Sequence, residues 1–501
     1  MKNFLVYLIL SALVNLSYCQ NHDINWMFGG TNFIPGEKDG ILLNFDESKR
    51  KILQQEIEIA IDQQNGTISD ADGKLLFYSN GCKVIGADHE MIEGGDSLNY
   101  GEWYSYINDC QYGYTGPQNM IILPDPGNAN GYYILHKKFQ PTPEDVSLAG
   151  IREYLYSYVA MSLNEGKGKV IYKNKLLFKR FGKLMGSFNA AVKHENNKDW
   201  WIIAIGNYSN TYFKFLLNKD GISVYDSTSI GEKLLDPNIS SGGQSKFSPD
   251  GRKYALFSVI SGLLLFDFDR STGALAFVKK FKILHTLSFT GLEFSANGRF
   301  LYISVIDTLY QLDLSEPNLD DGLRVVGVWD KSSNPFETTF CLMQRGPDCR
   351  IYISSPSSTN TIHVINNPDG LGDACDFRQH GLDLNDRSTG TLSMPNFPNY
   401  RLDTGPVCDP SIATSTSPLF QAVQPVMVWP NPAHDVIHLD LPQDKSKGIY
   451  QIYDITGRLV VSAFVSDIDT GIDVSNLGRG IYVVRYIDND GGAFSGKVLL
   501  E

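Results

Sequence analysis

Short hydrophobic runs separated by polar turns fill most of the chain from residue 25 to about residue 405. Runs such as KLLFYSNG, DWWIIAIGN and RFLYISVI are rich in Val, Ile, Tyr and Phe, and Gly, Asp, Asn or Pro residues lie between the runs. These residue types favour strands that are half-buried in a sheet. Apolar positions at helical spacing are hard to find in this part of the chain. The pattern therefore predicts an all-β domain.

A polar turn followed by a hydrophobic strand recurs along this domain. Four clear copies are TISDADGKLLFYSNG, SKFSPDGRKYALFSV, LEFSANGRFLYISVI and LMQRGPDCRIYISSP, and two looser copies begin at Asn119 and Ala190. Phe247 and Phe294 hold equivalent positions in two copies, and their separation is close to the length of one propeller blade, about 40–50 residues. Six copies and one blade shared between the chain ends predict a seven-bladed β-propeller, with six or eight blades as alternatives.

The shared blade would join the two ends of the domain. INWMFGGTNF and ILLNFD would supply its outer strands, and LSMPNFPNY, residues 392–400, would supply its innermost strand. Pairing of the ends would leave no open sheet edge, which is the advantage of a closed ring of blades. A pair of β-sandwiches is the competing architecture, but it does not predict a turn that recurs at blade spacing.

A second, smaller β-domain follows the first. Residues 406–425 are rich in Pro, Ser and Thr and are expected to form a linker, so the propeller would span residues 20–405. Beyond the linker, Ile437, Leu439 and Leu441 alternate with polar residues. This alternation, repeated in several short runs, predicts that residues 426–501 form a small Ig-like β-sandwich.

The C-terminal segment carries four sequence elements in a fixed order. They are Pro430-Asn431-Pro432, Asp454 with Gly457, Gly480 with Tyr482, and Lys497. Together they resemble the type A sorting domain of the type IX secretion system. The resemblance implies recognition by the type IX secretion machinery, export through the Sec route and the periplasm, and transfer across the outer membrane. In that family the domain is usually removed afterwards, often with attachment of the mature protein to the cell surface. An ordinary Ig-like binding module is the alternative, although it would not need all four elements.

The propeller also carries motifs of a known group. SDADGKLLFYSNG, GPDCRIYIS, VINNPDGLGDACDF and MPNF, in this order, resemble the WD-repeat-like propellers of exported proteins from Bacteroidetes. The likeness extends from Trp26 to Tyr400. Cys349 departs from it by standing where the pattern usually has Gly, and a local Cys341–Cys349 bridge would fit that departure.

The N-terminus has the pattern of a secretory signal peptide over residues 1–19. Lys2 provides the positive charge, residues 4–16 are mostly apolar, and Ser17-Tyr18-Cys19 resembles a cleavage site. A lipoprotein with Cys19 as the lipidated residue is the alternative, but Tyr18 is bulky where such sites usually have a small residue. No other apolar stretch approaches the ~20 residues of a membrane-spanning helix, so no membrane span is expected.

Six cysteines remain when Cys19 is set aside. An even number in an exported chain suggests disulfides, and six cysteines allow about 15 connectivities. Sequence proximity favours the pairs Cys82–Cys110, Cys341–Cys349 and Cys375–Cys408. The spacing C-x-x-C is absent and histidines do not cluster beside the cysteines, so zinc is not expected.

The charge and the motifs exclude several classes of function. A net charge of −13 argues against nucleic acid or anionic membranes as main partners. The GDSL string around Ser97 resembles a lipase motif but lies in a polar loop of an all-β chain, without the strand-to-helix context that this chemistry needs. The pairs Asp70/Asp72 and Asp369/Asp373 could bind calcium, yet Asp is also a common turn former. We therefore expect no catalytic residues, no metal and no cofactor, with calcium as the alternative.

One loop is unusually aromatic. Between residues 100 and 116 it contains six rings, which are Tyr100, Trp103, Tyr104, Tyr106, Tyr112 and Tyr114. Tyr and Trp offer large contact areas that are part apolar and part polar, so such a loop on a rigid domain suits the binding of a protein or a glycan. The alternative is that these rings pack onto the propeller itself.

The sequence thus predicts a secreted or cell-surface propeller that binds an extracellular protein or glycan, as a scaffold or an adhesin-like protein. The rival hypothesis is an extracellular hydrolase or lyase with its site at the mouth of the propeller channel. Clustered acidic or histidine residues with raised carboxyl pKa values at that mouth would favour the enzyme, and an aromatic rim would favour binding.

Overall fold

The structure is a computed structural model of the full chain. It describes residues 20–29, 39–46, 49–141, 150–234, 243–258, 260–283, 290–384, 389–390, 392–403, 408, 424–441, 448–454, 459–465, 471–488 and 493–501. The predicted signal peptide and most of the predicted linker lie outside the described residues. The chain divides into two compact units, Met1–Ser415 and Thr416–Glu501.

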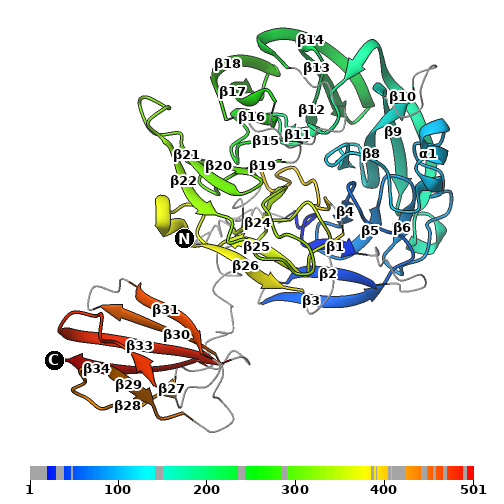
Figure 1. Cartoon of the computed structure of the whole chain (residues 1–501). Helices are drawn as coiled ribbons and strands as arrows, with labels where there is room; N and C mark the ends of the chain where they lie inside the picture. Colours follow the sequence, from blue (N-terminus) through cyan, green and yellow to red (C-terminus); the bar gives the residue numbers. More distant parts are fainter. Residues whose placement is uncertain are drawn as a thin grey trace, which may run out of the picture. The chain divides into compact units, whose positions relative to one another are not determined.

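The described strands of the first unit form seven sheets that follow one another in chain order. Figure 1 shows these sheets, from blue to yellow, arranged around a common centre. In every sheet neighbouring strands are consecutive in the chain and antiparallel; the first two sheets have three described strands and the other five have four. The prediction of a seven-bladed β-propeller is therefore confirmed.

The strands and helices have the following bounds. Blade 1 contains β1 (Asn25–Gly29), β2 (Asp39–Asp46) and β3 (Lys49–Glu56); blade 2 contains β4 (Gly66–Ser69), β5 (Leu75–Ser79) and β6 (Val84–Gly86); blade 3 contains β7 (Met120–Asp125), β8 (Asn128–Gln140), β9 (Gly150–Ala160) and β10 (Lys169–Leu184); blade 4 contains β11 (Ala190–Lys193), β12 (Trp200–Ile205), β13 (Ser209–Asn218) and β14 (Gly221–Leu234). Blade 5 contains β15 (Gln244–Phe247), β16 (Lys253–Ser258), β17 (Gly262–Asp269) and β18 (Ala274–Phe281); blade 6 contains β19 (Thr290–Phe294), β20 (Phe300–Val305), β21 (Thr308–Asp313) and β22 (Leu323–Val328); blade 7 contains β23 (Met343–Arg345), β24 (Ile351–Ile353), β25 (Thr361–Ile365) and β26 (Phe377–Asp383). The short helices are α1 (Glu102–Tyr106), η1 (Asn108–Cys110), η2 (Asn164–Gly166) and η3 (Gly372–Cys375).

Burial decreases from the centre of the propeller outwards. The innermost strands β4, β11 and β19 are buried at every position, and so are the second strands β12 and β20. The outer strand β14, by contrast, is exposed along much of its length. The continuous hydrophobic runs of the sequence are thus strands whose two faces are both covered by neighbouring blades, which explains why they do not alternate.

The chain returns to blade 1 at the end of the propeller, as predicted. The side-chain amide of Asn65 donates to the Met27 carbonyl at 2.6 Å in β1 and to Ser393 Oγ at 3.0 Å in the returning segment. The Phe397 ring lies 5.9 Å from the Trp26 ring of β1. Beyond it, the Arg401 guanidinium donates to the Asp23 carboxylate at 2.6 Å, just before β1 begins. The two ends of the domain therefore meet.

The returning segment does not, however, form the predicted innermost strand. Residues 392–400 make no ladder with β1 among the described residues. The Asn396 amide instead donates to the carbonyls of Met120 and Asn189, at 3.0 and 2.8 Å, in blades 3 and 4. Pro395 and Pro398 explain the difference, because a proline has no N–H to donate to a neighbouring strand. The segment fills the propeller channel through its side chains.

The disulfides correct two of the three predicted pairs. Cys82 and Cys110 are bridged as expected, but Cys349 is bridged to Cys408, and Cys341 and Cys375 are buried free thiols. The Cys341 N–H donates to the Ser354 carbonyl at the open end of the β23–β24 hairpin, whereas Cys349 lies in the turn at the opposite end. Cys341 and Cys349 are therefore held apart by the hairpin.

The position of Cys349 explains why the pattern usually has Gly there. Its φ angle is +68°, in the left-handed region that glycine adopts most readily. The bridge to Cys408, which lies 59 positions further on, fastens the end of the propeller segment to blade 7.

The second unit is a small sandwich of two sheets. One sheet has the order β27-β34-β33-β30-β31, with bounds Gln424–Pro425, Ala493–Leu500, Gly480–Asp488, Gly448–Asp454 and Leu459–Val465. The other sheet has the order β28-β29-β32, with bounds Val428–Trp429, Val436–Leu439 and Ile472–Asp473. Ile437, Ile452 and Val484 are among the residues of its core. The predicted β-sandwich is confirmed.

The four C-terminal sequence elements meet at two places in this sandwich. The Asn431 amide donates to the Lys497 carbonyl at 3.0 Å, and its Oδ1 accepts from the Leu499 N–H at 3.0 Å. On β30, Asp454 lies opposite Tyr482 of β33. The Tyr482 hydroxyl donates to the Gly478 carbonyl just before Gly480, which has a φ angle of +153°. Pro430 and Pro432 lie on either side of Asn431, and Gly457 lies outside the described residues.

Candidate functional site

The aromatic loop follows β6 in blade 2. At the same position, blades 3 to 7 have a fourth strand. The described residues 87–119 form no strand there and contain α1 and η1 instead. α1 packs against β8 of blade 3. The predicted loop is therefore a compact segment with its own short helix, which sits on the side of two neighbouring blades.

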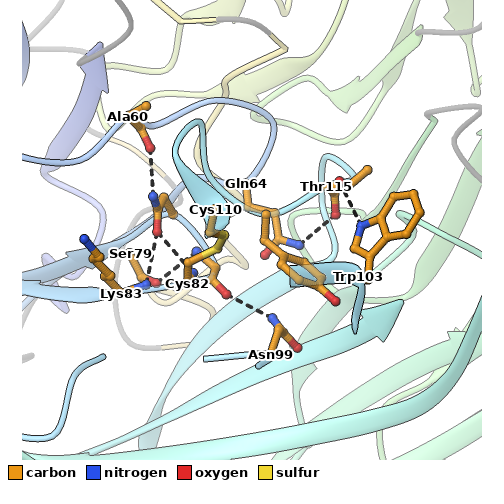
Figure 2. Close-up of a disulfide and its surroundings, with 12 residues drawn as sticks. Ala60, Gln64, Ser79, Cys82, Lys83, Asn99, Trp103, Cys110 and Thr115 are labelled. Atoms are coloured by element: carbon orange, nitrogen blue, oxygen red, sulfur yellow. Dashed lines mark hydrogen bonds between the residues drawn. A yellow bond between two sulfur atoms is a disulfide. The ribbon is translucent and has the colours of Figure 1, made fainter. Parts of the chain in front are cut away.

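A disulfide and a hydrogen bond fasten this loop to the segments that border β4 and β5 in blade 2 (Figure 2). The Cys82–Cys110 bridge joins the segment after β5 to the end of η1. The Gln64 amide donates to the Thr115 carbonyl at 3.0 Å, and the Trp103 indole N–H donates to Thr115 Oγ1 at 3.2 Å. The loop is thus held in place at Trp103, Cys110 and Thr115.

Asn80 organises the turn to which the loop is attached. Its Oδ1 accepts from the N–H groups of Cys82 and Lys83, both at 3.1 Å, and its Nδ2 donates to the Ala60 carbonyl at 2.9 Å. Its backbone carbonyl accepts from the Tyr114 N–H at 2.9 Å. One buried residue therefore links the segment after β3, the turn and the loop, and its buried side-chain oxygen and nitrogen both have hydrogen-bond partners.

Three of the six predicted binding rings pack into the protein. Tyr114 and Tyr104 are buried, and Trp103 is half-buried. The Trp103 ring stacks on Phe139 of β8 at a centroid distance of 5.5 Å, and the Tyr114 hydroxyl accepts from the Phe139 N–H at 3.0 Å. Burial also raises the pKa of the Tyr104 and Tyr114 hydroxyls. The packing alternative therefore describes these three rings.

The other three rings are exposed. Tyr100, Tyr106 and Tyr112 are 61%, 54% and 51% exposed, and we call them the aromatic surface. Tyr106 lies 5.0 Å from the Trp103 ring, and Tyr100 lies 5.5 Å from the Tyr104 ring. Two of the exposed tyrosines thus lie against rings that are themselves buried or half-buried.

Three lysines within residues 167–173, part of a basic stretch that extends in the sequence to Lys183, pair with an acidic segment just before the aromatic loop. The ion pairs, each partly or largely exposed, are Lys167–Asp88 at 3.0 Å, Lys169–Glu93 at 2.5 Å and Lys173–Asp96 at 2.9 Å. These bonds lower the pKa of the Asp88 and Asp96 carboxyls. Exposed pairs stabilise little individually. They do neutralise these three lysines, which reduces the positive charge on this side of blade 3.

Ser97 of the GDSL string is a turn residue. Its φ angle is +58°, its hydroxyl donates to the adjacent Asp96 carboxylate at 2.9 Å, and its carbonyl accepts from the Asn174 amide at 2.9 Å. A serine nucleophile instead needs its hydroxyl bonded to a base that a third group orients.

The proposed calcium ligands also act in turns. Asp70 Oδ1 accepts from the N–H groups of Asp72 and Lys74, at 3.0 and 2.9 Å. Asp369 Oδ1 accepts from the Asn297 N–H at 3.0 Å. Within the described ranges, His, Cys, Asp and Glu side chains do not gather in any group of three or more that could hold a metal ion.

A charged cluster that was not predicted lies in the propeller channel. The Lys246 ammonium of β15 lies 3.2 Å from the Glu293 carboxylate of β19 and donates to Gln344 Oε1 of β23 at 2.6 Å. Arg345 Nη1 lies 3.8 Å from Glu293 Oε1. All four side chains are buried or nearly so, and burial lowers the pKa of Lys246 and of Arg345. Glu293 therefore interacts with two cations, and the cluster joins blades 5, 6 and 7.

The free space at this cluster is small. The cavity measures about 30 Å³ and is closed on one side by residues 396–399 of the returning segment. Such a volume holds a water molecule or two but no organic substrate. A sequence signal for the cluster exists, because Lys246, Glu293 and Gln344, all polar or charged, occupy one aligned position in three copies of the repeat.

Comparison with known proteins identifies the C-terminal unit. Residues 427–501 match the family of secretion system C-terminal sorting domains. The protein is therefore exported by the type IX route to the outside of the cell or to its surface. In the described residues no helix is both long and apolar enough to cross a membrane. Comparison with curated proteins gave no significant match over the chain.

Solved structures similar to this chain include two propellers described as lactonases. One is a proposed 6-phosphogluconolactonase from Bacteroides fragilis, with 15% identity, a TM-score of 0.42, and coverage of 74% of this chain and 97% of that one. Another is a periplasmic gluconolactonase from Pseudomonas aeruginosa, with 12% identity, a TM-score of 0.39, and coverage of 74% and 98%. Likenesses of this strength say nothing about the substrate or activity of this chain.

Proposed function

We propose that this exported propeller is a binding protein, and that the aromatic surface of blade 2 is where it contacts a partner protein. The observation that carries the proposal is the presentation of Tyr100, Tyr106 and Tyr112 on a loop that is fixed by a disulfide and by buried rings. Preorganised tyrosines lose little conformational entropy on binding and offer both apolar area and a hydroxyl, which is why such rings dominate many protein interfaces.

The arrangement of the rings favours a protein over a glycan. The large indole face of Trp103, the one tryptophan of the loop, is not open to a sugar, because the ring stacks on Phe139 and also contacts Tyr106. The exposed rings are accompanied by the exposed carboxylates of Glu102 and Asp109. A partner with a basic surface would complement these charges. An adhesin-like or scaffold role, in a WD-repeat-like propeller of the kind exported by Bacteroidetes, follows from this proposal.

The channel gives less support to a hydrolase or lyase. Such an enzyme would need a free carboxylate at the channel mouth, yet Glu293 is engaged by Lys246 and Arg345, and the returning segment fills the space beside it. Burial does raise the pKa of one carboxyl, that of Asp348, but Asp348 is buried, accepts from the Tyr352 hydroxyl at 2.7 Å and lies near Arg350.

The test compares the full-length secreted protein with a variant that carries Tyr100→Ser, Tyr106→Ser and Tyr112→Ser. Tyr208→Ser is the matched control, because Tyr208 is equally exposed but lies between β12 and β13 of blade 4. Proteins of the cell surface and medium are captured, identified and then titrated one by one. We expect one partner to bind the triple variant at least about tenfold more weakly, and the control normally.

Three outcomes would contradict the proposal. If the triple variant bound every captured partner as tightly as the unmodified protein does, the aromatic surface would not be part of the interface. Glycans bound on an array, and lost in the same variant, would make the ligand a glycan. Turnover by the protein in a broad hydrolase panel would support the enzyme hypothesis instead.

A further inference from the structure

A second candidate site lies away from the aromatic surface, where the turns of three blades meet. A cleft of about 590 Å³ opens between the β4–β5 turn, the β7–β8 turn and the β11–β12 turn, and the N-terminal residues Gln20 and His22 form part of its wall. We call it the turn cleft. Its volume is within the range of small-molecule sites, roughly 300–1,000 Å³. The channel cavity, by comparison, has room only for water.

His22 provides a hydrogen-bond acceptor at the base of the turn cleft. Its side chain is only 6% exposed, and its Nδ1 lies 2.6 Å from the Ser69 carbonyl, which requires the hydrogen to be on Nδ1. Burial lowers the pKa of the ring, so the imidazole is neutral and Nε2 keeps its lone pair. Among the described residues Nε2 has no hydrogen-bond partner, although His22 lines the cleft.

Lys193 provides a donor beside it. Its side chain is 2% exposed, its ammonium donates to Gln20 Oε1 at 2.6 Å, and it lies 5.6 Å from the centre of the Trp200 ring. None of the described carboxylates lies within ion-pair distance of this ammonium. One of its three N–H groups is used by Gln20, so the others are available to the cleft that Lys193 lines.

The rim of the cleft is polar and nearly balanced in charge. Asp72, Asn130 and Lys198 are exposed on the three turns. The lining contains three aspartates and two lysines in all, so no single sign of charge dominates. Leu76 and Met161 add apolar area to the walls. A strongly charged ligand would therefore meet opposing charges, whereas a neutral polar ligand would not.

We propose that the turn cleft binds a neutral sugar. A hydroxyl group both donates and accepts, so adjacent hydroxyls match the acceptor of His22 and the donor of Lys193 at the base. The carboxylate of Asp72 and the amide of Asn130 can bind further hydroxyls at the rim, and the apolar walls suit the C–H faces of a sugar ring. This inference does not depend on the aromatic surface.

The test uses the full-length protein and a panel of glucose, galactose, mannose, N-acetylglucosamine and their disaccharides. Binding is detected by saturation-transfer NMR and measured by calorimetry. We expect at least one of these sugars to bind, and the double variant Asp72→Ala, Asn130→Ala to weaken it by at least about tenfold. Both side chains are exposed, so the fold should be unaffected. Asp220→Ala, on the exposed β13–β14 turn, is the matched control and should bind normally.

A Lys193→Met variant, checked for folding by circular dichroism, tests the base of the cleft in the same way. Absence of saturation transfer from every sugar in the panel would overturn the proposal, and so would unchanged affinity in both the rim variant and the Lys193 variant. Glucuronate or glucosamine binding more tightly than the neutral sugars would show that the ligand class is charged.

Discussion

Buried histidines show, at the scale of single residues, how this protein ties its stability to pH. His363 is buried in β25, its Nε2–H donates to the Thr338 carbonyl at 2.8 Å, and its Nδ1 accepts from the His380 N–H at 3.2 Å. Both nitrogens are thus satisfied in the neutral ring. Burial lowers the pKa of His363 to about 4 and that of His136 to about 3.

Acid is therefore expected to destabilise the propeller between about pH 6.5 and pH 4. In that window the unfolded chain binds protons on these histidines and the folded chain does not, so the free energy of unfolding falls as the pH falls. His363 alone accounts for about 3 kcal/mol, because burial lowers its pKa from 6.5 to about 4. His363→Gln should flatten the pH dependence measured by denaturant unfolding. An unchanged slope would mean that His363 does not contribute.

Gly81 supports the aromatic loop through the closeness of its backbone. Its φ angle is +81°, and a Cβ atom there would collide with Gln64 Oε1 and lie 2.8 Å from the Tyr114 Cβ. Gly81→Ala should lower the free energy of unfolding by about 2 kcal/mol or more. Gly166→Ala is the matched control, since Gly166 has a φ angle of +86° but a Cβ atom added there would meet no other atom within 4 Å. If the two variants lost the same free energy of unfolding, close packing at Gly81 would not contribute to stability.

At the scale of elements, local patterns predict more than long-range ones. The turn-and-strand repeat predicts each blade because a blade is built from consecutive strands, and the polar turns lie where the repeat places them. The path of residues 392–400 depends partly on Pro395 and Pro398, which the sequence shows, and partly on contacts with distant blades, which the motif does not reveal. The pairing of Cys349 with Cys408 likewise depends on which end of a hairpin each cysteine occupies.

The candidate site divides in the same way. The six aromatic rings stand out in the sequence, but their division into three anchors and three exposed tyrosines depends on Phe139, a residue of the next blade. The turn cleft is likewise formed by the turns of three blades, so no single sequence motif predicts it.

The Cys82–Cys110 bridge should control the rigidity of the aromatic loop. A disulfide that spans 28 positions stabilises by about 3.6 kcal/mol in the chain-entropy view. Changing both cysteines to serine should speed proteolysis within residues 100–116, measured by limited digestion and mass spectrometry. The double variant Cys349→Ser, Cys408→Ser is the control and should instead expose cleavage sites near residue 408. Protection of the loop in the first variant would show that its packing alone is sufficient.

At the scale of the whole molecule, the propeller and the domain that directs export are separate structural units. The propeller forms one compact unit, and the matched sorting domain lies within the other. Each unit has its own hydrophobic core among the described residues. The propeller should therefore fold without the sandwich, and the sandwich should act on whatever is attached to it.

Deletion of residues 426–501 should stop export and leave folded propeller in the periplasm. Cell fractionation and circular dichroism of the recovered protein measure the two parts of this expectation. A fusion of residues 426–501 to an unrelated periplasmic protein is the complementary experiment and should reach the medium or the cell surface. Normal secretion of the deleted chain would contradict the role of the domain.

The returning segment also sets an order of events during synthesis. Its side chains fill the channel beside Glu293, and Asn396 and Arg401 join blades that were made hundreds of residues apart. A chain interrupted before residue 392 lacks this segment and, because the sorting domain comes later still, lacks its export label as well. A chain that lacks the end of the propeller therefore also lacks the sorting domain. Because export depends on that domain, incomplete propellers are kept out of the secreted population.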